Sequence, residues 1–187
     1  MRKPILNIIT LGCSKNKVDS EHLAALLEHK YLIRHDSDQK ADVVIINTCG
    51  FIGDAQEESI DCILEYAELR KKNKISKLYV VGCLSQRFRK ELQEEIQEVD
   101  GFYGVESVNL IAADILKEEL PADYCSRRVL STPKHYAYLK ISEGCNRRCA
   151  FCAIPLIRGG HVSVPMENLL EEAKQLAKKG VKELILI

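Results

Sequence analysis

The segment "DVVIINTCG", Asp42 to Gly50, decides the fold expected for this chain. Its apolar residues run without alternation, which is typical of a strand buried on both faces of a parallel sheet. Comparable strands are predicted in "PILNIITLG" (Pro4 to Gly12) and "KLYVVGC" (Lys77 to Cys83). Shorter strands are predicted in "YLIR" (31–34) and "GFYGV" (101–105).

Helical patterns separate these strands, and apolar residues recur in them at spacings of three and four. The helices are predicted over residues 18–29, 54–72, 85–97 and 107–119. Asp19 or Ser20 is expected to cap the first helix and Ser85 the third, because short polar side chains favour that position. The residues expected to face the core from the second helix are Ile60, Ile63, Leu64 and Ala67.

Alternating strands and helices predict an α/β domain over residues 1–120, because right-handed crossovers place helices on both faces of a parallel sheet. The expected architecture is a Rossmann-like or flavodoxin-like three-layer domain. Residues 121–134, "PADYCSRRVLSTPK", lose the periodicity, carry two prolines and are predicted to form a linker.

A second unit is predicted over residues 135–187. It contains a strand in "HYAYLKISEGC" (135–145), a helix over 168–179 and a strand in "ELILI" (183–187). The residues expected on the buried face of this helix are Leu169, Leu170, Ala173, Leu176 and Ala177. This is one βαβ unit, and a core-like strand is the last element of the sequence. We therefore expect the chain to be a truncated piece of a longer protein.

Composition places the chain among soluble proteins. Of 187 residues, 46% are hydrophobic and 29% charged, and the formal net charge is zero, so no global field favours nucleic acid or an acidic membrane. No segment approaches the roughly 20 apolar residues that span a bilayer. We expect a cytoplasmic protein without a membrane partner. In that reducing compartment, eight cysteines favour metal or redox chemistry over disulfides.

Three of the cysteines, Cys13, Cys49 and Cys83, each follow a predicted parallel strand directly. The carboxyl ends of such strands share one edge of the sheet, where ligands bind, so the three thiols are expected to converge. A single cysteine there could simply be a small buried residue, but three at one edge favour a metal or cluster. Zinc usually recruits a fourth ligand, and none is obvious. A four-iron cluster with one iron free of cysteine fits better.

A second set of cysteines lies in "EGCNRRCAFC", Glu143 to Cys152. The spacing of Cys145, Cys149 and Cys152 suits three corners of a cubane cluster. Zinc ribbons favour paired CxxC motifs, and a redox CxxC would leave Cys145 unexplained. Three arginines are expected around this second set, either as solvated charges or to offset an anionic cluster and meet substrate: Arg147, Arg148 and Arg158.

The CxxxCxΦC pattern, with aromatic Phe151 before its last cysteine, resembles the radical S-adenosylmethionine enzymes. The resemblance implies that the free iron binds S-adenosyl-L-methionine, whose cleavage yields a 5′-deoxyadenosyl radical. It also implies that Phe151 contacts the adenine, and that residues 135–187 open a (β/α) partial barrel of the TIM type.

Four motifs together resemble the methylthiotransferases within that superfamily. They are "LGCSKNKVDSE" (11–21), "NTCGFI" (47–52), "VGCLSQR" (81–87) and "SEGCNRRCAFCAIPLIRG" (142–159). The resemblance implies two four-iron, four-sulfur (4Fe-4S) clusters, the auxiliary one held by Cys13, Cys49 and Cys83. An electron donor such as flavodoxin or ferredoxin is expected. No catalytic acid or base is assigned.

The "GCSKN…VDSE" pattern is closest to the branch that adds a methylthio group to the β-carbon of an aspartate in small-subunit ribosomal protein twelve, although Ser14 stands where that branch often has proline. Methylthiolation of tRNA adenosine is the alternative, and a non-catalytic iron–sulfur or zinc module is a further one. Since most of the barrel and a small C-terminal domain would be missing, the 187-residue chain alone is predicted to be inactive.

Overall fold

The computed structural model describes residues 2–37, 39–105, 107–120 and 126–187. The first five residues of the predicted linker, 121–125, lie outside these ranges. In the described part, no helix combines the length and the apolar character needed to cross a membrane.

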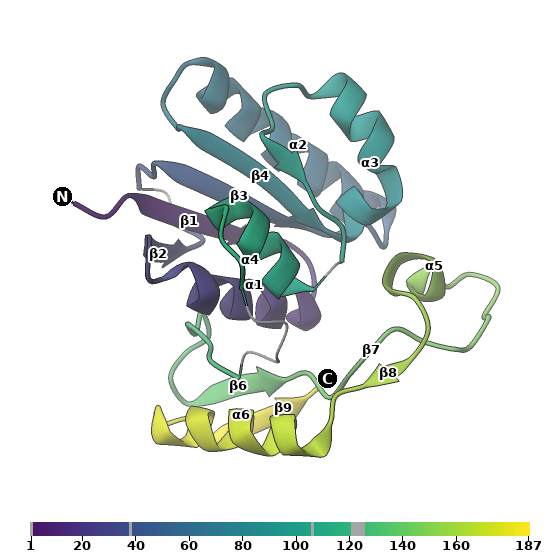
Figure 1. Cartoon of the computed structure of the whole chain (residues 1–187). Coiled ribbons are helices and arrows are strands. Elements are labelled where there is room, and N and C mark those ends of the chain that lie inside the picture. Colours follow the sequence, from purple (N-terminus) through teal and green to yellow (C-terminus); the bar gives the residue numbers. More distant parts are fainter. Residues whose placement is uncertain (1, 38, 106, 121–125) are drawn as a thin grey trace.

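The first half is built on a five-stranded parallel sheet with the order β2-β1-β3-β4-β5 (Figure 1). The strands are β1 (Ile5–Thr10), β2 (Leu32–His35), β3 (Val43–Thr48), β4 (Lys77–Gly82) and β5 (Gly101–Phe102). This order is that of flavodoxin-like folds, so the predicted fold class is confirmed. In such sheets the ligand crevice opens where the strand order reverses, here between β1 and β3.

Four helices complete the three layers: α1 (Ser14–Leu27), α2 (Gly53–Lys71), α3 (Cys83–Glu95) and α4 (Val108–Leu116). Helices α1 and α4 cover one face of the sheet, and α2 and α3 cover the other (Figure 1). Every residue of β3 is buried, with Val44 and Ile46 in one core and Val43 and Ile45 in the other. This two-sided burial explains the unbroken apolar run in the sequence.

Two predicted helix starts were wrong. Helix α1 begins at Ser14 with Cys13 as its N-cap, so Asp19 and Ser20 lie inside the helix. Helix α3 begins at Cys83 with Gly82 as its N-cap, and Ser85 is buried within its first turn. Each strand ends within a few residues of its helix, so the helix begins next to the cysteine, before the position where the polar cap was expected.

The predicted inward face of α2 was partly wrong. Ile63 and Ala67 are buried as expected, but Ile60 is 38% exposed and Leu64 is 47% exposed. The buried stripe continues to Ser59, one turn before Ile63, so it runs at a spacing of four. Ser59 occupies an inner position because its hydroxyl donates to the carbonyl of Cys49 at 3.0 Å.

The second half contains the predicted βαβ unit, in which β6 (Tyr136–Leu139) and β9 (Glu183–Leu186) pair in parallel around α6 (Met166–Lys178). The strand predicted over 135–145 is interrupted after β6. Its end forms β7 (Ser142–Glu143), which pairs antiparallel with β8 (Val162–Ser163) and encloses α5 (Ile154–Arg158).

The predicted buried face of α6 was also partly wrong. Leu176 is buried with Ala137 and Val181, but Leu170 is 52% exposed and Ala177 is exposed. Glu172 takes an inner position instead, because it pairs with a charge from the predicted linker. The described linker residues, 126–134, form no helix or strand, yet Arg128 among them is fully buried.

Candidate functional site

The first set of cysteines lies at the carboxyl edge of the sheet, after β1, β3 and β4. Cys49 and Cys83 are buried and Cys13 is exposed. The side-chain oxygen of Asn16 lies 4.0 Å from the sulfur of Cys13 and 3.9 Å from that of Cys83. A Cβ on Gly12 would lie 2.8 Å from the sulfur of Cys49. The structure therefore brings the three thiols together, as the strand ends predicted.

Glycines give this set its shape. Gly12 and Gly82 precede Cys13 and Cys83 and have φ of +86° and +98°, which side-chain-bearing residues rarely adopt. A Cβ on Gly12 would lie 2.5 Å from the Cβ of Cys49. A side chain at position 12 would therefore collide with the side chain of Cys49, so the loops after β1 and β3 need glycine there to approach this closely. This donor set suits an iron–sulfur cluster.

Asn16 holds the loops in place and was not predicted as a site residue. It is fully buried, and its side-chain nitrogen donates to the carbonyls of Leu11 and Thr48, each at 2.9 Å. Asn47 adds a bond from its side-chain nitrogen to the carbonyl of Asn16 at 2.9 Å. Since Leu11 and Thr48 flank two of the cysteines, one amide side chain fixes both loops. The only signal in the sequence was its place in "GCSKN".

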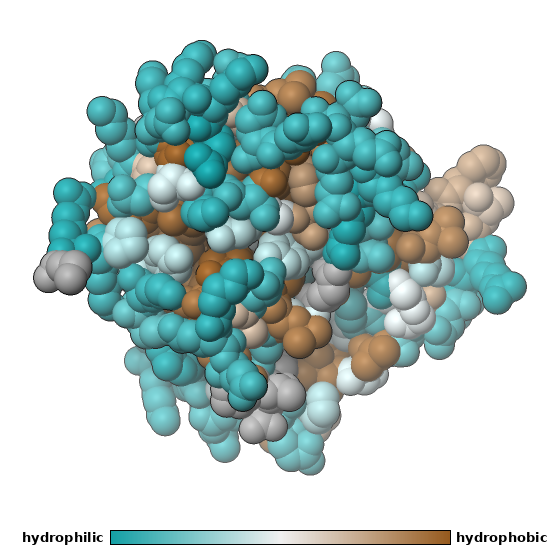
Figure 2. Space-filling view, turned by 45° about the horizontal axis from the view of Figure 1, so that its top comes forward, coloured by the Kyte–Doolittle hydropathy of each residue, from teal (hydrophilic) through white to brown (hydrophobic). Residues whose placement is uncertain are grey.

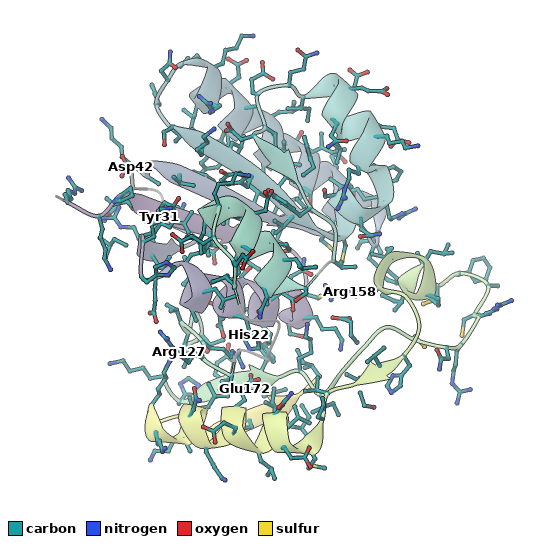
Figure 3. The ribbon with its side chains drawn as sticks, in the orientation of Figure 1. His22, Tyr31, Asp42, Arg127, Arg158 and Glu172 are labelled. Carbon is teal, nitrogen blue, oxygen red and sulfur yellow. The ribbon has the colours of Figure 1, made fainter. Side chains whose placement is uncertain are left out.

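Arg158 was expected around the second set. Its side chain extends from α5 toward α1 (Figure 3), where it reaches Asn16 beside the first set. The side chain is only 3% exposed, and its guanidinium donates to the Asn16 side-chain oxygen and, at 2.8 Å, to Glu143. Burial raises the pKa of the Cys83 thiol, and the charge and hydrogen bond of Arg158 oppose that rise. Arg147 and Arg148 are exposed, which agrees with the alternative that predicted them to be solvated charges.

The second set occupies the loop between β7 and α5. Cys145 and Cys152 are half-buried and Cys149 is exposed. The loop is held by bonds from the Cys145 amide to the Gly159 carbonyl, at 3.0 Å, and from the Cys152 amide to the Cys149 carbonyl, at 3.1 Å. Apolar side chains reach the surface at this edge (Figure 2), and Phe151 is fully exposed. Its contact with adenine stays a prediction.

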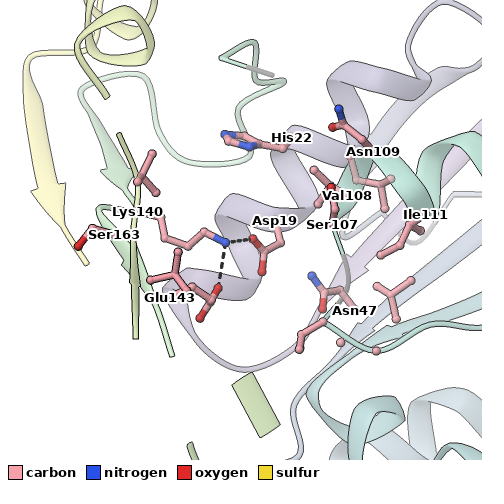
Figure 4. A pocket seen from close by; sticks show the side chains of 17 residues that line it. Asp19, His22, Asn47, Ser107, Val108, Asn109, Ile111, Lys140, Glu143 and Ser163 are labelled. Carbon is pink, nitrogen blue, oxygen red and sulfur yellow. Dashed lines mark hydrogen bonds and ion pairs between the residues drawn. The ribbon is translucent and has the colours of Figure 1, made fainter. Parts of the chain in front are cut away.

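A cavity of about 460 Å³ opens beside the first set, between α1, α4 and the β7–β8 pair (Figure 4). Gly82 lies in its wall, one residue before Cys83. On another wall, Lys140 pairs with Asp19 and, at 3.1 Å, with Glu143. Burial alone would lower the pKa of Lys140, but the two carboxylates outweigh it and raise the pKa.

Within the ranges that the structure describes, no three Cys, His, Asp or Glu side chains are grouped closely enough to hold a single metal ion. A zinc ion would require its thiolates about 2.3 Å from the metal.

Comparison with known families assigns the two halves separately. Residues 6–104 match the uncharacterized protein family UPF0004, and the chain belongs to that family. Residues 139–187 match the radical SAM superfamily, which implies a 4Fe-4S cluster and S-adenosylmethionine.

Individual relatives carry a more specific name, ribosomal protein uS12 methylthiotransferase RimO. The chain is 52% identical to the one from Phocaeicola vulgatus, over 100% of this chain and 44% of that protein. It is 51% identical to the one from Porphyromonas gingivalis, over 100% and 43%. It is 52% identical to one from Bacteroides fragilis, over 98% and 43%. The chain thus spans less than half the length of these relatives.

Proposed function

We propose that this chain is part of a radical S-adenosylmethionine methylthiotransferase that modifies an aspartate of ribosomal protein uS12 at its β-carbon. The observation that carries the proposal is the presence of two three-cysteine sets, one at the carboxyl edge of the sheet and one in the β7–α5 loop. Three thiolates leave one iron of a cubane without a cysteine ligand, so each set could hold a cluster that also binds another molecule.

In this proposal each half of the chain holds one cluster. Cys145, Cys149 and Cys152 would hold the cluster that, with S-adenosylmethionine, supplies radical abstraction of a hydrogen atom from an unactivated carbon. The first set, at Cys13, Cys49 and Cys83, would hold the auxiliary cluster for the sulfur and methyl groups. An electron donor such as flavodoxin or ferredoxin would reduce the radical site.

The residues around the first set orient and shield it. Asn16 ties two cysteine loops together, and the buried Cys49 and Cys83 face away from water while Cys13 faces it. The open side of the set is therefore the side of Cys13. The neighbouring cavity, whose wall includes Gly82 and the pairs of Lys140 with Asp19 and Glu143, would offer a polar wall to a bound peptide.

Iron content tests the two cluster sites. After anaerobic reconstitution the chain should carry about eight irons, since each cubane holds four. Replacing Cys13, Cys49 and Cys83 by alanine should leave about four, and so should the same change at the second set. A colourless protein that carries zinc, or an iron content unchanged by either triple substitution, would contradict the proposal.

Activity requires the longer protein, because the relatives are more than twice as long as this chain. Mass spectrometry of uS12 should show one methylthio group on an aspartate after reaction with S-adenosylmethionine, a sulfur source and a reductant. The 187-residue chain alone is expected to leave uS12 unmodified. Methylthioadenosine in a tRNA digest, with unmodified uS12, would replace this substrate with tRNA.

A further inference from the structure

Arg158 connects the two cysteine sets physically. Its backbone belongs to the second, because the carbonyl of the next residue, Gly159, accepts the bond from the Cys145 amide at 3.0 Å. Its side chain contacts the first set, because the guanidinium donates to the side-chain oxygen of Asn16. That oxygen lies 4.0 Å from the sulfur of Cys13 and 3.9 Å from the sulfur of Cys83. A five-residue helix, α5, carries this arginine at its end.

The junction around Arg158 holds more positive than negative charge. Arg158 shares it with two lysines and two carboxylates: Lys15, Lys140, Asp19 and Glu143. Three cations thus face two carboxylates, and the side chain of Arg158 is only 3% exposed. Arg158 and Lys140 share the same two carboxylates, and Lys15 donates to the carbonyl of Ser142 at 2.6 Å. The positive charge of the junction is therefore only partly balanced, which favours an anionic group beside it.

A cubane on three thiolates is such a group, because the thiolates outweigh the positive charge of its oxidised core. Reduction adds one more negative charge to it. A fixed cation and a hydrogen bond at a ligand sulfur both favour the reduced form, and they are among the means by which proteins set cluster potentials. Arginine suits this role, because its fork can bind Asn16, Glu143 and a sulfur from one plane.

We propose that Arg158 is a positioning residue for the auxiliary cluster, holding a positive charge against Cys83 and so raising the reduction potential of that cluster. This inference rests on the proposed function, since it requires a cluster at the first set. It adds that α5, an element of the radical half, sets the electronic properties of the auxiliary site. A shift of the β7–α5 loop would then change both sites together.

The test uses the chain with Cys145, Cys149 and Cys152 replaced by alanine, so that only the auxiliary cluster remains. Its reduction potential is measured by titration followed by electron paramagnetic resonance. Arg158→Gln removes the charge and is expected to shift the potential downward, whereas Arg158→Lys is expected to restore most of it. Arg148→Gln, at an exposed arginine of the same loop, is the matched control and should leave the potential unchanged.

A second variant keeps the inference testable if Arg158→Gln fails to fold. Asp19→Asn removes one carboxylate from the junction with little change of shape, and it is expected to shift the potential upward. If the triple-alanine chain takes up no iron, the auxiliary site of the proposed function fails. If it takes up about four irons but neither Arg158→Gln nor Asp19→Asn moves the potential, the role of Arg158 is overturned and the proposed function stands.

Discussion

Replacing Arg128 by methionine should destabilise the protein far more than an ordinary surface substitution. The Arg128 side chain is fully buried and donates to Glu21 at 3.0 Å and to Glu172 at 2.9 Å. Methionine fills a similar volume but leaves both carboxylates buried without this cation. Breaking one side of a buried ion pair costs about 3–5 kcal/mol, because an uncompensated charge stays in a low-dielectric interior.

We expect a loss of about 4 kcal/mol for Arg128→Met, towards the middle of that range. His22, 3.4 Å from Glu172, and Ser131, which donates to Glu21, remain to compensate part of the lost interaction. With a urea slope of about 2 kcal/mol per molar, the midpoint should fall by about 2 M. The assay is urea unfolding at pH 7, followed by far-ultraviolet circular dichroism and by tyrosine fluorescence, since the chain has no tryptophan.

The neighbouring Arg127 provides a matched control. It pairs with Glu28, but the two side chains are 64% and 39% exposed, and such surface pairs contribute about 0–1 kcal/mol. Arg127→Met should therefore barely move the midpoint. Adding Glu21→Gln and Glu172→Gln to Arg128→Met should recover part of the loss, because no buried charge then lacks a partner. Equal midpoints for the two methionine variants would refute the reasoning.

Three further outcomes are expected. Burial alone would raise the pKa of Asp100, but hydrogen bonds from Arg70 and Lys77 outweigh it and lower the pKa. Asp100→Asn should thus cost about 2 kcal/mol at pH 7. In urea unfolding, the difference should fade as the pH falls through that lowered pKa, and a constant difference would contradict this assignment. Burial raises the pKa of Cys62 to about 11, so iodoacetamide at pH 8 should label exposed Cys149 well before Cys62, as peptide mass spectrometry would show. Gly12→Ala should cost about 1–3 kcal/mol in backbone strain and lower the iron content, whereas Gly53→Ala, with nothing within 4 Å, should do neither.

The convergence of Cys13, Cys49 and Cys83 could be predicted because it depends on topology alone. An unbroken apolar run identifies a central strand, and parallel strands end at one edge wherever the details of the helices lie. The helix starts could not be predicted in the same way. Ser and Asp are favoured as caps, but α1 begins directly after the loop that follows β1, so Cys13 is its N-cap.

The buried ion pairs of Arg128 and Arg158 could not be predicted, because they depend on where long side chains reach. Arg128 lies in a segment without periodicity, and its partner Glu21 is 107 residues away in the sequence. Arg158 is close to the second set in sequence, yet its side chain extends from α5 to Asn16, 142 residues earlier. Periodic patterns report which face of an element is buried, and they carry no information about pairs of this kind.

Helix α1 determines how the two halves fit together. Asn16 and Asp19, near the start of α1, contact Arg158, and Glu21, slightly further along the helix, contacts Arg128. An apolar junction would tolerate sliding, since hydrophobic attraction has no preferred direction. The bonds of Arg128 and Arg158 do not tolerate sliding, because a guanidinium donates its hydrogen bonds in a fixed, planar geometry. A one-residue shift of α1 would leave buried charges unpaired at a cost of about 3–5 kcal/mol. Since Cys13 is the N-cap of α1, the contacts that hold the second half against α1 also fix the position of the second half relative to Cys13.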